Sequence, residues 1–276
     1  MTNRSGVLPN QPLFYVLTSI RFQPWLLLPM KIAEIQDVLR ERFPIVSPII
    51  VEHQHQRSEL GTAESDANSR RPVAWAFHRA DRKIGCQISA NSIMVHAREY
   101  ERFEAFAETV AFVVNAVEAA AKHLDVNSVG IRYLDLISPR GGETLSKYVP
   151  LEFIPYPAHE TEFTPTGGHS QSSYKTPDGI LQARFWSGEQ FLSVPDDLVP
   201  SFMLTQDWTK LSSHPIASLR PEEGILDTDS IWNTSEPVRM GSDMIVEKLS
   251  VLHAHTNSFF RSVCSEHAFR VWQGEN

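Results

Sequence analysis

The order of secondary-structure patterns between Pro12 and Ile137 constrains the fold of this chain more than any other feature. Apolar periodicity predicts, in order, a strand (Phe14–Phe22), a helix (Met30–Phe43), an antiparallel ribbon of two or three strands (Val73–Ala97), a helix (Glu101–Leu124) and a strand (Val129–Ile137). This strand–helix–strand–strand–helix–strand order is the split βαβ, or ferredoxin-like, arrangement. We therefore expect a ferredoxin-like unit over residues 12–138. Because such folds carry many unrelated activities, the expected fold does not define a function.

The sequence pattern of the second half of the chain predicts a smaller antiparallel β unit over residues 150–276. Pro139, Gly141 and Gly142 mark the boundary before it. The expected elements are a polar, Gly-rich segment (Gly167–Gly179), strands in Ile180–Val194, Met203–Trp208 and Ala217–Asp229, a long helix (Asp243–Val263) and a short helical tail (Glu266–Trp272). The whole chain is therefore expected to be α+β, with its second unit closed by the long C-terminal helix.

Composition indicates a globular protein of the reducing cytosol. Of the 276 residues, 42% are hydrophobic and 21% are charged, which is typical of a folded domain with a substantial core. Two widely separated cysteines, Cys86 and Cys264, form no disulfide framework. Residues Met1–Gln11 lack the apolar segment of a signal peptide. No stretch approaches the ~20 apolar residues of a membrane span, so we expect a cytoplasmic protein without a membrane partner.

The net charge of −8 bears on the kind of partner. An acidic chain disfavours a broad nucleic-acid-binding surface, although a local basic patch is compatible with it. The same charge suits association with a basic protein. A protein partner is therefore the favoured expectation, and nucleic acid stays open as a less favoured one.

Motifs for cofactor-dependent chemistry are missing from the sequence. It contains no GxxxxGK[ST] phosphate loop, no GxGxxG after a strand, no GxSxG and no CxxC. We therefore predict no cofactor. A Ser-His-Asp triad stays open, because the members of a triad lie far apart in sequence.

Two histidine pairs raise the question of a metal site. His53 and His55 could face one side of an extended segment, within the polar stretch Val51–Arg71 that reads as a long exposed loop. His253 and His255 are two apart on a predicted helix and so point in different directions, whereas metal-binding helices use a spacing of four. We interpret both pairs as polar surface positions and predict no metal site.

Two groups of residues would fit an enzyme acting on phosphodiesters. His169, in the segment with Gly167, Gly168 and Lys175, could be a general base beside a phosphate. The segment lacks dense basic residues, so a surface turn with a lone histidine is the simpler interpretation.

The second group consists of three acids. Asp227 and Asp229 would share one face of a strand, and Asp135 on another strand could complete a metal-binding set. The simpler interpretation is an acidic, solvent-facing side of a strand that discourages edge-to-edge pairing.

Arginines within apolar strands are candidate binding residues. Arg21 and Arg132 lie in such stretches, where a partly buried guanidinium binds an anion or pairs with a carboxylate such as Asp135 or Asp227. Trp186 with its neighbour Arg184 could stack on a nucleic-acid base. An ion pair for each arginine and a core position for the tryptophan are the simpler interpretations.

Several different short motifs are distributed along most of the chain. They are Asn10, Pro12, Leu13, Ile20, Arg21 and Phe22; Trp75 and the Ile84–Val95 strands; Tyr100 and Phe103; a G-[IL]-R-Y-type strand with Gly130, Arg132, Tyr133 and Ile137; Leu226, Asp227 and Asp229; and the pair Leu252 and His253. Together they resemble a sporadically distributed bacterial family without an assigned activity. The late strand reads ILDTDSIW, so its acids keep the L-x-D-x-D pattern only approximately. The resemblance implies a bacterial or phage origin among mobile genes, where antitoxin and defence proteins occur, and implies no catalytic residue.

These observations favour a non-enzymatic protein-binding module, such as an antitoxin, an immunity protein or a defence-associated regulator. The alternative is an RNA-acting or metal-dependent phosphodiester enzyme that uses His169 or the three aspartates. A third hypothesis is a homo-oligomer that associates through the exposed sheet or through the C-terminal helix with Trp272.

Overall fold

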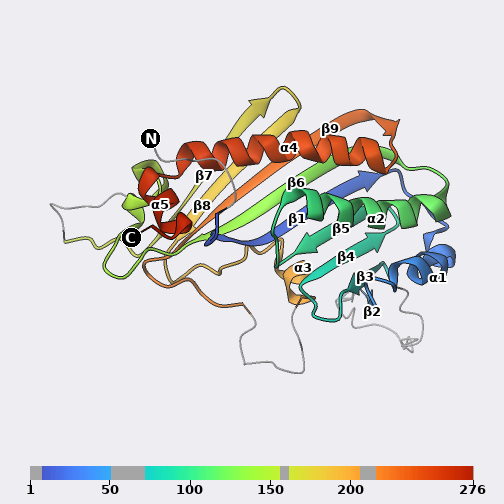
Figure 1. The fold of residues 1–276 in the computed structure, drawn as a ribbon, viewed down its shortest axis with the longest axis horizontal. Coiled ribbons are helices and arrows are strands. Elements are labelled where there is room, and N and C mark those ends of the chain that lie inside the picture. Colours follow the sequence, from blue (N-terminus) through green and yellow to red (C-terminus); the bar gives the residue numbers. More distant parts are fainter. Residues whose placement is uncertain (1–7, 51–71, 156–161, 206–215, 276) are drawn as a thin grey trace, which may run out of the picture.

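The computed structural model describes residues 8–50, 72–155, 162–205 and 216–275 (Figure 1). These residues form a mixed α+β fold around one large antiparallel sheet. The strands are β1 (Leu13–Phe22), β2 (Ile45–Ile49), β3 (Ala74–His78), β4 (Ile84–Ser89), β5 (Ser92–Ala97), β6 (Asp125–Ile137), β7 (Gly168–Thr176), β8 (Gly179–Ser187) and β9 (Gly224–Arg239). The helices are α1 (Leu28–Leu39), α2 (Phe103–Ala121), α3 (Val199–Met203), α4 (Ser242–Val263) and α5 (Glu266–Gln273), with short 3-10 turns at Leu145–Lys147 and Leu151–Phe153.

The described strands form a single sheet in the order β2-β3-β4-β5-β1-β6-β9-β8-β7. Each strand pairs antiparallel with its neighbours. Strand β9 lies between β6 and β8, so residues of the two predicted units, 12–138 and 150–276, are joined by main-chain hydrogen bonds. The sheet is therefore continuous across the boundary that the sequence indicated near residue 140.

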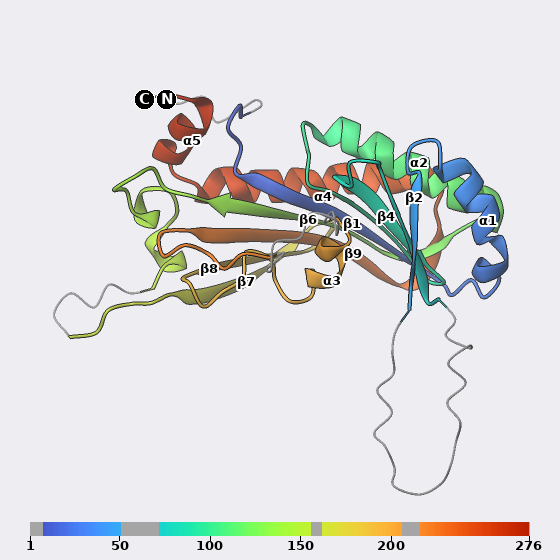
Figure 2. The same cartoon turned by 90° about the horizontal axis from the view of Figure 1, so that it is seen from below.

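Helices α1, α2 and α4 cover one face of the sheet, and α3 lies on the other (Figure 2). We call these the helical face and the α3 face. The largest core lies under the helical face, because alternate residues of each strand point toward it, among them Val129, Ile131 and Tyr133 of β6. Helix α4 packs against α2 as well as against β6 and β9, which connects the C-terminal helix to the N-terminal part of the chain.

Two smaller apolar clusters complete the core. Tyr15, Leu17 and Leu134 pack beneath α3 on the α3 face. At one end of the sheet, α5 closes over Ile137 and Phe185. The remaining buried side chains of this end cluster are Leu8, Tyr148, Val149, Leu226, Cys264, Ala268, Phe269 and Trp272. Trp272 stacks on Phe260 and is buried, so its ring belongs to the core and is not an exposed surface for oligomerisation.

The structure differs from the sequence-based expectation mainly at the sheet edges. Strand β2 forms in a segment with two prolines, and β7 forms where the sequence indicated an irregular polar segment. Both are outermost strands with many exposed residues, so they need little apolar alternation. In place of the predicted strand Met203–Trp208, α3 ends at Met203 and a turn follows at Leu204 and Thr205. Residues 206–208 of that strand, and the segment 51–71, lie outside the described residues. Strand β9 begins at Gly224 and continues to Arg239.

Two observations bear on the environment of the protein. Within the described ranges, no helix combines the length and apolar character needed to cross a membrane. Cys86 and Cys264 are both buried free thiols, and burial raises the pKa of the Cys86 thiol. Neither cysteine is therefore engaged in a disulfide in the described part of the chain.

Candidate functional site

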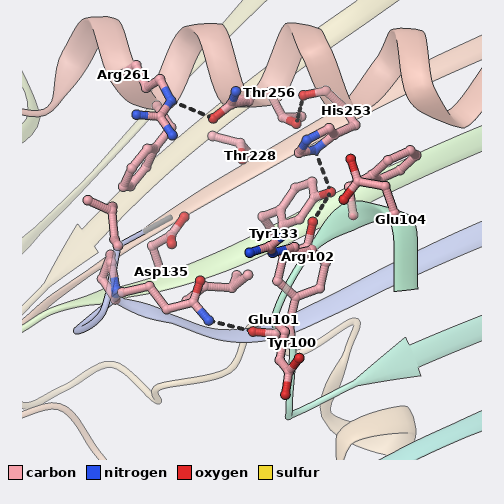
Figure 3. A pocket seen from close by; sticks show the side chains of 17 residues that line it. Tyr100, Glu101, Arg102, Glu104, Tyr133, Asp135, Thr228, His253, Thr256 and Arg261 are labelled. Atoms are coloured by element: carbon pink, nitrogen blue, oxygen red, sulfur yellow. Dashed lines mark hydrogen bonds between the residues drawn. The ribbon is translucent and has the colours of Figure 1, made fainter. Parts of the chain in front are cut away.

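A cavity of about 500 Å³ opens on the helical face, between the sheet, the N-terminal end of α2 and the C-terminal half of α4 (Figure 3). Its walls combine aromatic rings with ionisable and hydroxyl side chains, which is the usual character of a ligand-binding cavity. The lining residues are Leu8, Gln11, Pro12, Leu13, Tyr100, Glu101, Arg102, Phe103, Glu104, Tyr133, Asp135, Thr228, His253, Thr256, Asn257, Phe260 and Arg261.

Regular periodicities bring these side chains together. Tyr133 and Asp135 are two residues apart on β6, so both point to the helical face. His253, Thr256 and Phe260 follow one another at spacings of three and four on α4, which places them on one side of that helix. The cavity therefore collects residues from segments that are more than 100 positions apart in the chain.

Hydrogen bonds and ring stacking hold one wall of the cavity. The Tyr133 hydroxyl shares a hydrogen bond of 2.8 Å with His253 Nδ1, and its oxygen lies 3.5 Å from the Tyr100 hydroxyl. The His253 ring stacks on Phe103, with centroids 4.5 Å apart and planes nearly parallel. Burial lowers the pKa of His253 and raises the pKa of Tyr100 to about 12. This wall is therefore a neutral and ordered set of donors and acceptors at physiological pH.

Asp135 is the exceptional group in the cavity. Its carboxyl is 5% exposed and has no hydrogen bond or ion pair to any residue that the structure describes. Burial, followed by the nearby charge of Asp227, raises the pKa of Asp135 to about 8. A buried carboxyl without a partner costs stability, and such groups concentrate at functional sites.

A second group of charges lies on the α3 face. Arg132 donates two hydrogen bonds of 2.8 Å to the buried Asp227 and one of 2.6 Å to Asp197. Arg184 lies 2.9 Å from the same Asp227 carboxylate. Burial lowers the pKa of Arg132, but its bonds to Asp227 and Asp197 outweigh this and raise it overall. The donors of Arg132 are thus engaged by carboxylates, as the ion-pair interpretation predicted.

The three candidate acids do not form one site, and the interpretation of a solvent-facing acidic strand side is also wrong, because Asp135 and Asp227 are buried on inner strands of the sheet. Residue Asp135 faces the helical side of the sheet, whereas Asp227 and Asp229 belong to the α3 face with Arg132, opposite Arg184 and Gln182 of β8. Burial raises the pKa of Asp229 to about 6. No set of three or more metal-ligating side chains gathers within the described ranges. The alternation of side chains along β6 and β9 is the physical reason for this separation.

His169 lies on the edge strand β7 and not in a phosphate-binding loop. It sits opposite Trp186 of β8, with ring centroids 6.4 Å apart. Trp186 is buried and donates a hydrogen bond of 2.9 Å to the Leu192 carbonyl, so its ring is a core element and not an exposed surface for base stacking. Arg21, expected to be partly buried, is exposed near the end of β1.

The two histidine pairs have different outcomes. His253 lines the cavity, while His255 points to Asp178, with 3.2 Å between its Nε2 and a carboxylate oxygen. The two side chains therefore point in different directions, as their spacing on a helix predicted, but the interpretation of His253 as a surface position is wrong, because its ring stacks on Phe103 in the cavity wall. His53 and His55 lie outside the described residues.

A further buried group lies on the α3 face beside Tyr15. His78 and His96 are both fully buried, with ring centroids 5.4 Å apart, and none of their ring nitrogens has a hydrogen-bond partner. Burial lowers the pKa of His78 to about 4 and that of His96 to about 3. The pair therefore stays neutral in the folded protein near pH 7.

Sequence reasoning missed the cavity as a site, although it had named part of its wall. Pro12, Leu13, Tyr100, Phe103, Tyr133 and His253 belong to the short motifs described in the sequence analysis, and all line the cavity. Individually these residues read as core or surface positions. One sequence signal could have indicated the cavity. Tyr133 and Asp135 are two polar residues on the same face of one strand, and that face is covered by helices.

Comparison with known proteins adds no assignment to this geometry. No protein-family model and no curated protein matches the chain. A function for the chain therefore has to follow from the cavity and the charges around it.

Proposed function

We propose that this protein is a non-enzymatic binding module and that the cavity beside Tyr133 and Asp135 is its recognition site. The observation that carries this proposal is a cavity of about 500 Å³ whose side chains are held in place by hydrogen bonds and stacking, while one buried carboxyl stays without a partner. A preorganised wall of this kind lowers the entropic cost of binding.

The partner in this proposal is a protein that presents a side chain to the cavity. The net charge of −8 favours encounter with a basic partner. The family resemblance, part of whose motif residues line this cavity, adds the context of an antitoxin, an immunity protein or a defence-associated regulator. The buried free thiols support the cytoplasm as its place of action.

Fold details support a ferredoxin-like core as a further part of the proposal. Strands β4, β5, β1 and β6 are consecutive in the sheet, with α1 following β1 and α2 connecting β5 to β6. In this interpretation the β2–β3 hairpin extends the edge of the core, and β7–β9 extend its other side.

The alternative function, an RNA-acting or metal-dependent phosphodiester enzyme, has less geometric support. It needs Asp135 on the same face as Asp227 and Asp229, or His169 beside a phosphate-binding loop. The acids lie on opposite faces, and His169 lies on an edge strand.

The test is affinity purification of the tagged protein from its native host, in parallel with two tryptophan variants on α4. Asn257→Trp introduces a bulky side chain at a cavity-lining position, and Ser258→Trp adds the same side chain at an exposed position next to it. We expect a stoichiometric protein partner with the unmodified protein and with Ser258→Trp, and its loss with Asn257→Trp. Circular dichroism confirms that both variants fold.

Other outcomes overturn the proposal. A partner that Asn257→Trp retains places recognition elsewhere on the surface. Recovery of RNA or DNA that survives moderate salt, without a protein, favours the phosphodiester enzyme. Light scattering of the purified protein identifies a second copy of the chain as the partner if the protein alone is oligomeric.

A further inference from the structure

We propose that the cavity recognises a positively charged side chain, a lysine ammonium or an arginine guanidinium presented by the partner protein. This inference rests on the proposed function and specifies the chemistry of the group that enters the site. It follows from three independent features of the cavity: the unpartnered carboxyl, the aromatic walls and the position of the remaining charges.

The unpartnered carboxyl supplies the counter-charge, because a cation that enters the cavity favours the ionised form of Asp135. Asp135 is 5% exposed and lines the cavity (Figure 3), yet no described donor or cation contacts it. The other deeply buried carboxylate of the sheet, Asp227, is contacted by both Arg132 and Arg184. Asp227 is thus stabilised by two cations, whereas no described cation contacts Asp135. A cationic N–H donor that enters the cavity would give Asp135 the same kind of pairing.

The aromatic walls suit a cation as well. Tyr100, Phe103, Tyr133 and Phe260 all line the cavity, and Tyr100 meets Tyr133 edge to face with ring centroids 5.8 Å apart. The face of an aromatic ring attracts an ammonium or a guanidinium, and the attraction increases when water is excluded. The same rings accommodate the aliphatic part of a lysine or arginine side chain. Both contributions favour a cationic side chain over a neutral one of the same length.

The remaining charges of the cavity lie toward solvent or on the α4 wall. Glu101, Arg102 and Glu104 are exposed at the start of α2. Arg261 donates a hydrogen bond of 2.9 Å to Asn257 on the next turn of α4. Burial raises the pKa of Asp135, and no described cation contacts its carboxyl. Although Arg102 and Arg261 line the same cavity, the Asp135 carboxyl therefore still has a pairing position for a bound lysine or arginine.

The experiment measures binding of small side-chain probes by two-dimensional NMR. The probes are N-acetyl-lysine methylamide, N-acetyl-arginine methylamide and the neutral analogue N-acetyl-norleucine methylamide. We expect a cationic probe to shift the amide resonances around Asp135, Thr228 and His253 and to bind at least tenfold more tightly than the norleucine probe. Asp135→Asn should reduce the affinity for the cationic probe at least tenfold. The control Asp196→Asn removes an exposed carboxylate next to α3 and should leave it unchanged.

Several results would overturn this inference. Equal binding of the norleucine probe shows that the cavity selects apolar bulk and not charge. Retention of affinity in Asp135→Asn removes the carboxyl from the recognition. If n-butylammonium binds as tightly as the lysine probe and no protein is captured from the host, the ligand is a free amine and the commitment to a partner protein is wrong.

The failure of this inference and the failure of the proposed function are distinguishable. A partner that depends on Asn257 for capture, together with cationic probes that do not bind, preserves the function and refutes the cationic chemistry. Probes that bind while capture does not depend on the cavity refute the protein partner.

Discussion

Asp227 provides the most stringent test of how the α3 face is stabilised. Its side chain is fully buried, and it accepts two hydrogen bonds of 2.8 Å from Arg132, whose side chain is 6% exposed. Arg184 lies 2.9 Å from the same carboxylate. Replacement by the nearly isosteric asparagine keeps the volume but removes the charge. Two guanidinium groups then lose their shared counter-charge, one of them deep in the protein.

The expected cost follows from these contacts. Removal of one partner from a buried ion pair costs about 3–5 kcal/mol. Asp197 still accepts the 2.6 Å bond from Arg132 in the variant, and because its side chain is 57% exposed it compensates only in part. We therefore expect Asp227→Asn to lower the free energy of unfolding by about 3–4 kcal/mol, at the lower end of that range. Asp197→Asn, which removes the exposed partner, should cost about 1 kcal/mol or less.

Urea denaturation followed by circular dichroism measures both variants. A double variant, Arg132→Met with Asp227→Leu, replaces the pair by apolar side chains and should recover most of the loss, because buried ion pairs are often replaceable by well-packed apolar groups. The reasoning is refuted if Asp227→Asn lies within about 1 kcal/mol of the unmodified protein, or if Asp197→Asn costs as much as Asp227→Asn.

Three further predictions concern buried groups elsewhere in the sheet. Burial lowers the pKa of His96 in the folded protein to about 3, so below about pH 6.5 the unfolded chain binds more protons than the folded one and stability should fall with the pH. His96→Phe should flatten this decline in urea midpoints measured between pH 7 and pH 4. An unchanged slope contradicts the prediction. Burial raises the pKa of Asp135 in the folded protein to about 8, so ionisation of this carboxyl costs stability at high pH. Asp135→Asn should therefore raise the thermal midpoint at pH 8 but not at pH 4. Equal shifts at both pH values refute an ionisation effect. An added Cβ at Gly85 would lie 2.4 Å from the His78 ring, so Gly85→Ala should cost about 1–3 kcal/mol in chemical denaturation; Gly141→Ala, with no atom within 4 Å of the new Cβ, is the matched control.

Agreement between sequence and structure is best where a long segment buries one face. The 3.6-residue apolar period places a helix at Glu101–Leu124, and α2 spans Phe103–Ala121. The same period locates α4 to within one residue of its start. Strand β1 follows the alternation seen in Phe14–Phe22. These elements bury enough apolar surface that their local pattern and their tertiary environment demand the same structure.

Agreement is poorest for edge strands and for the site. Strands β2 and β7 are exposed over much of their length, so hydrogen bonding to a neighbouring strand, and not apolar alternation, places them in the sheet. Asp135 and Asp227 looked equivalent as strand carboxylates. Their separation depends on register, since a side chain changes face with every residue of a strand.

The sequence by itself therefore determined the α+β class, the long helices and the central strands, because local periodicity encodes which side of each element is apolar. It also indicated that Arg132 either pairs with a carboxylate or binds an anion, because a guanidinium within an apolar strand is costly when unpaired. The pairing of β6 with β9 was decided only by the tertiary structure. That pairing gives Arg132 its partner Asp227. It also leaves the Asp135 carboxyl without a described cation on the helical face, in a cavity with Tyr133 and His253. Such contacts between distant segments depend on the packing of the whole sheet.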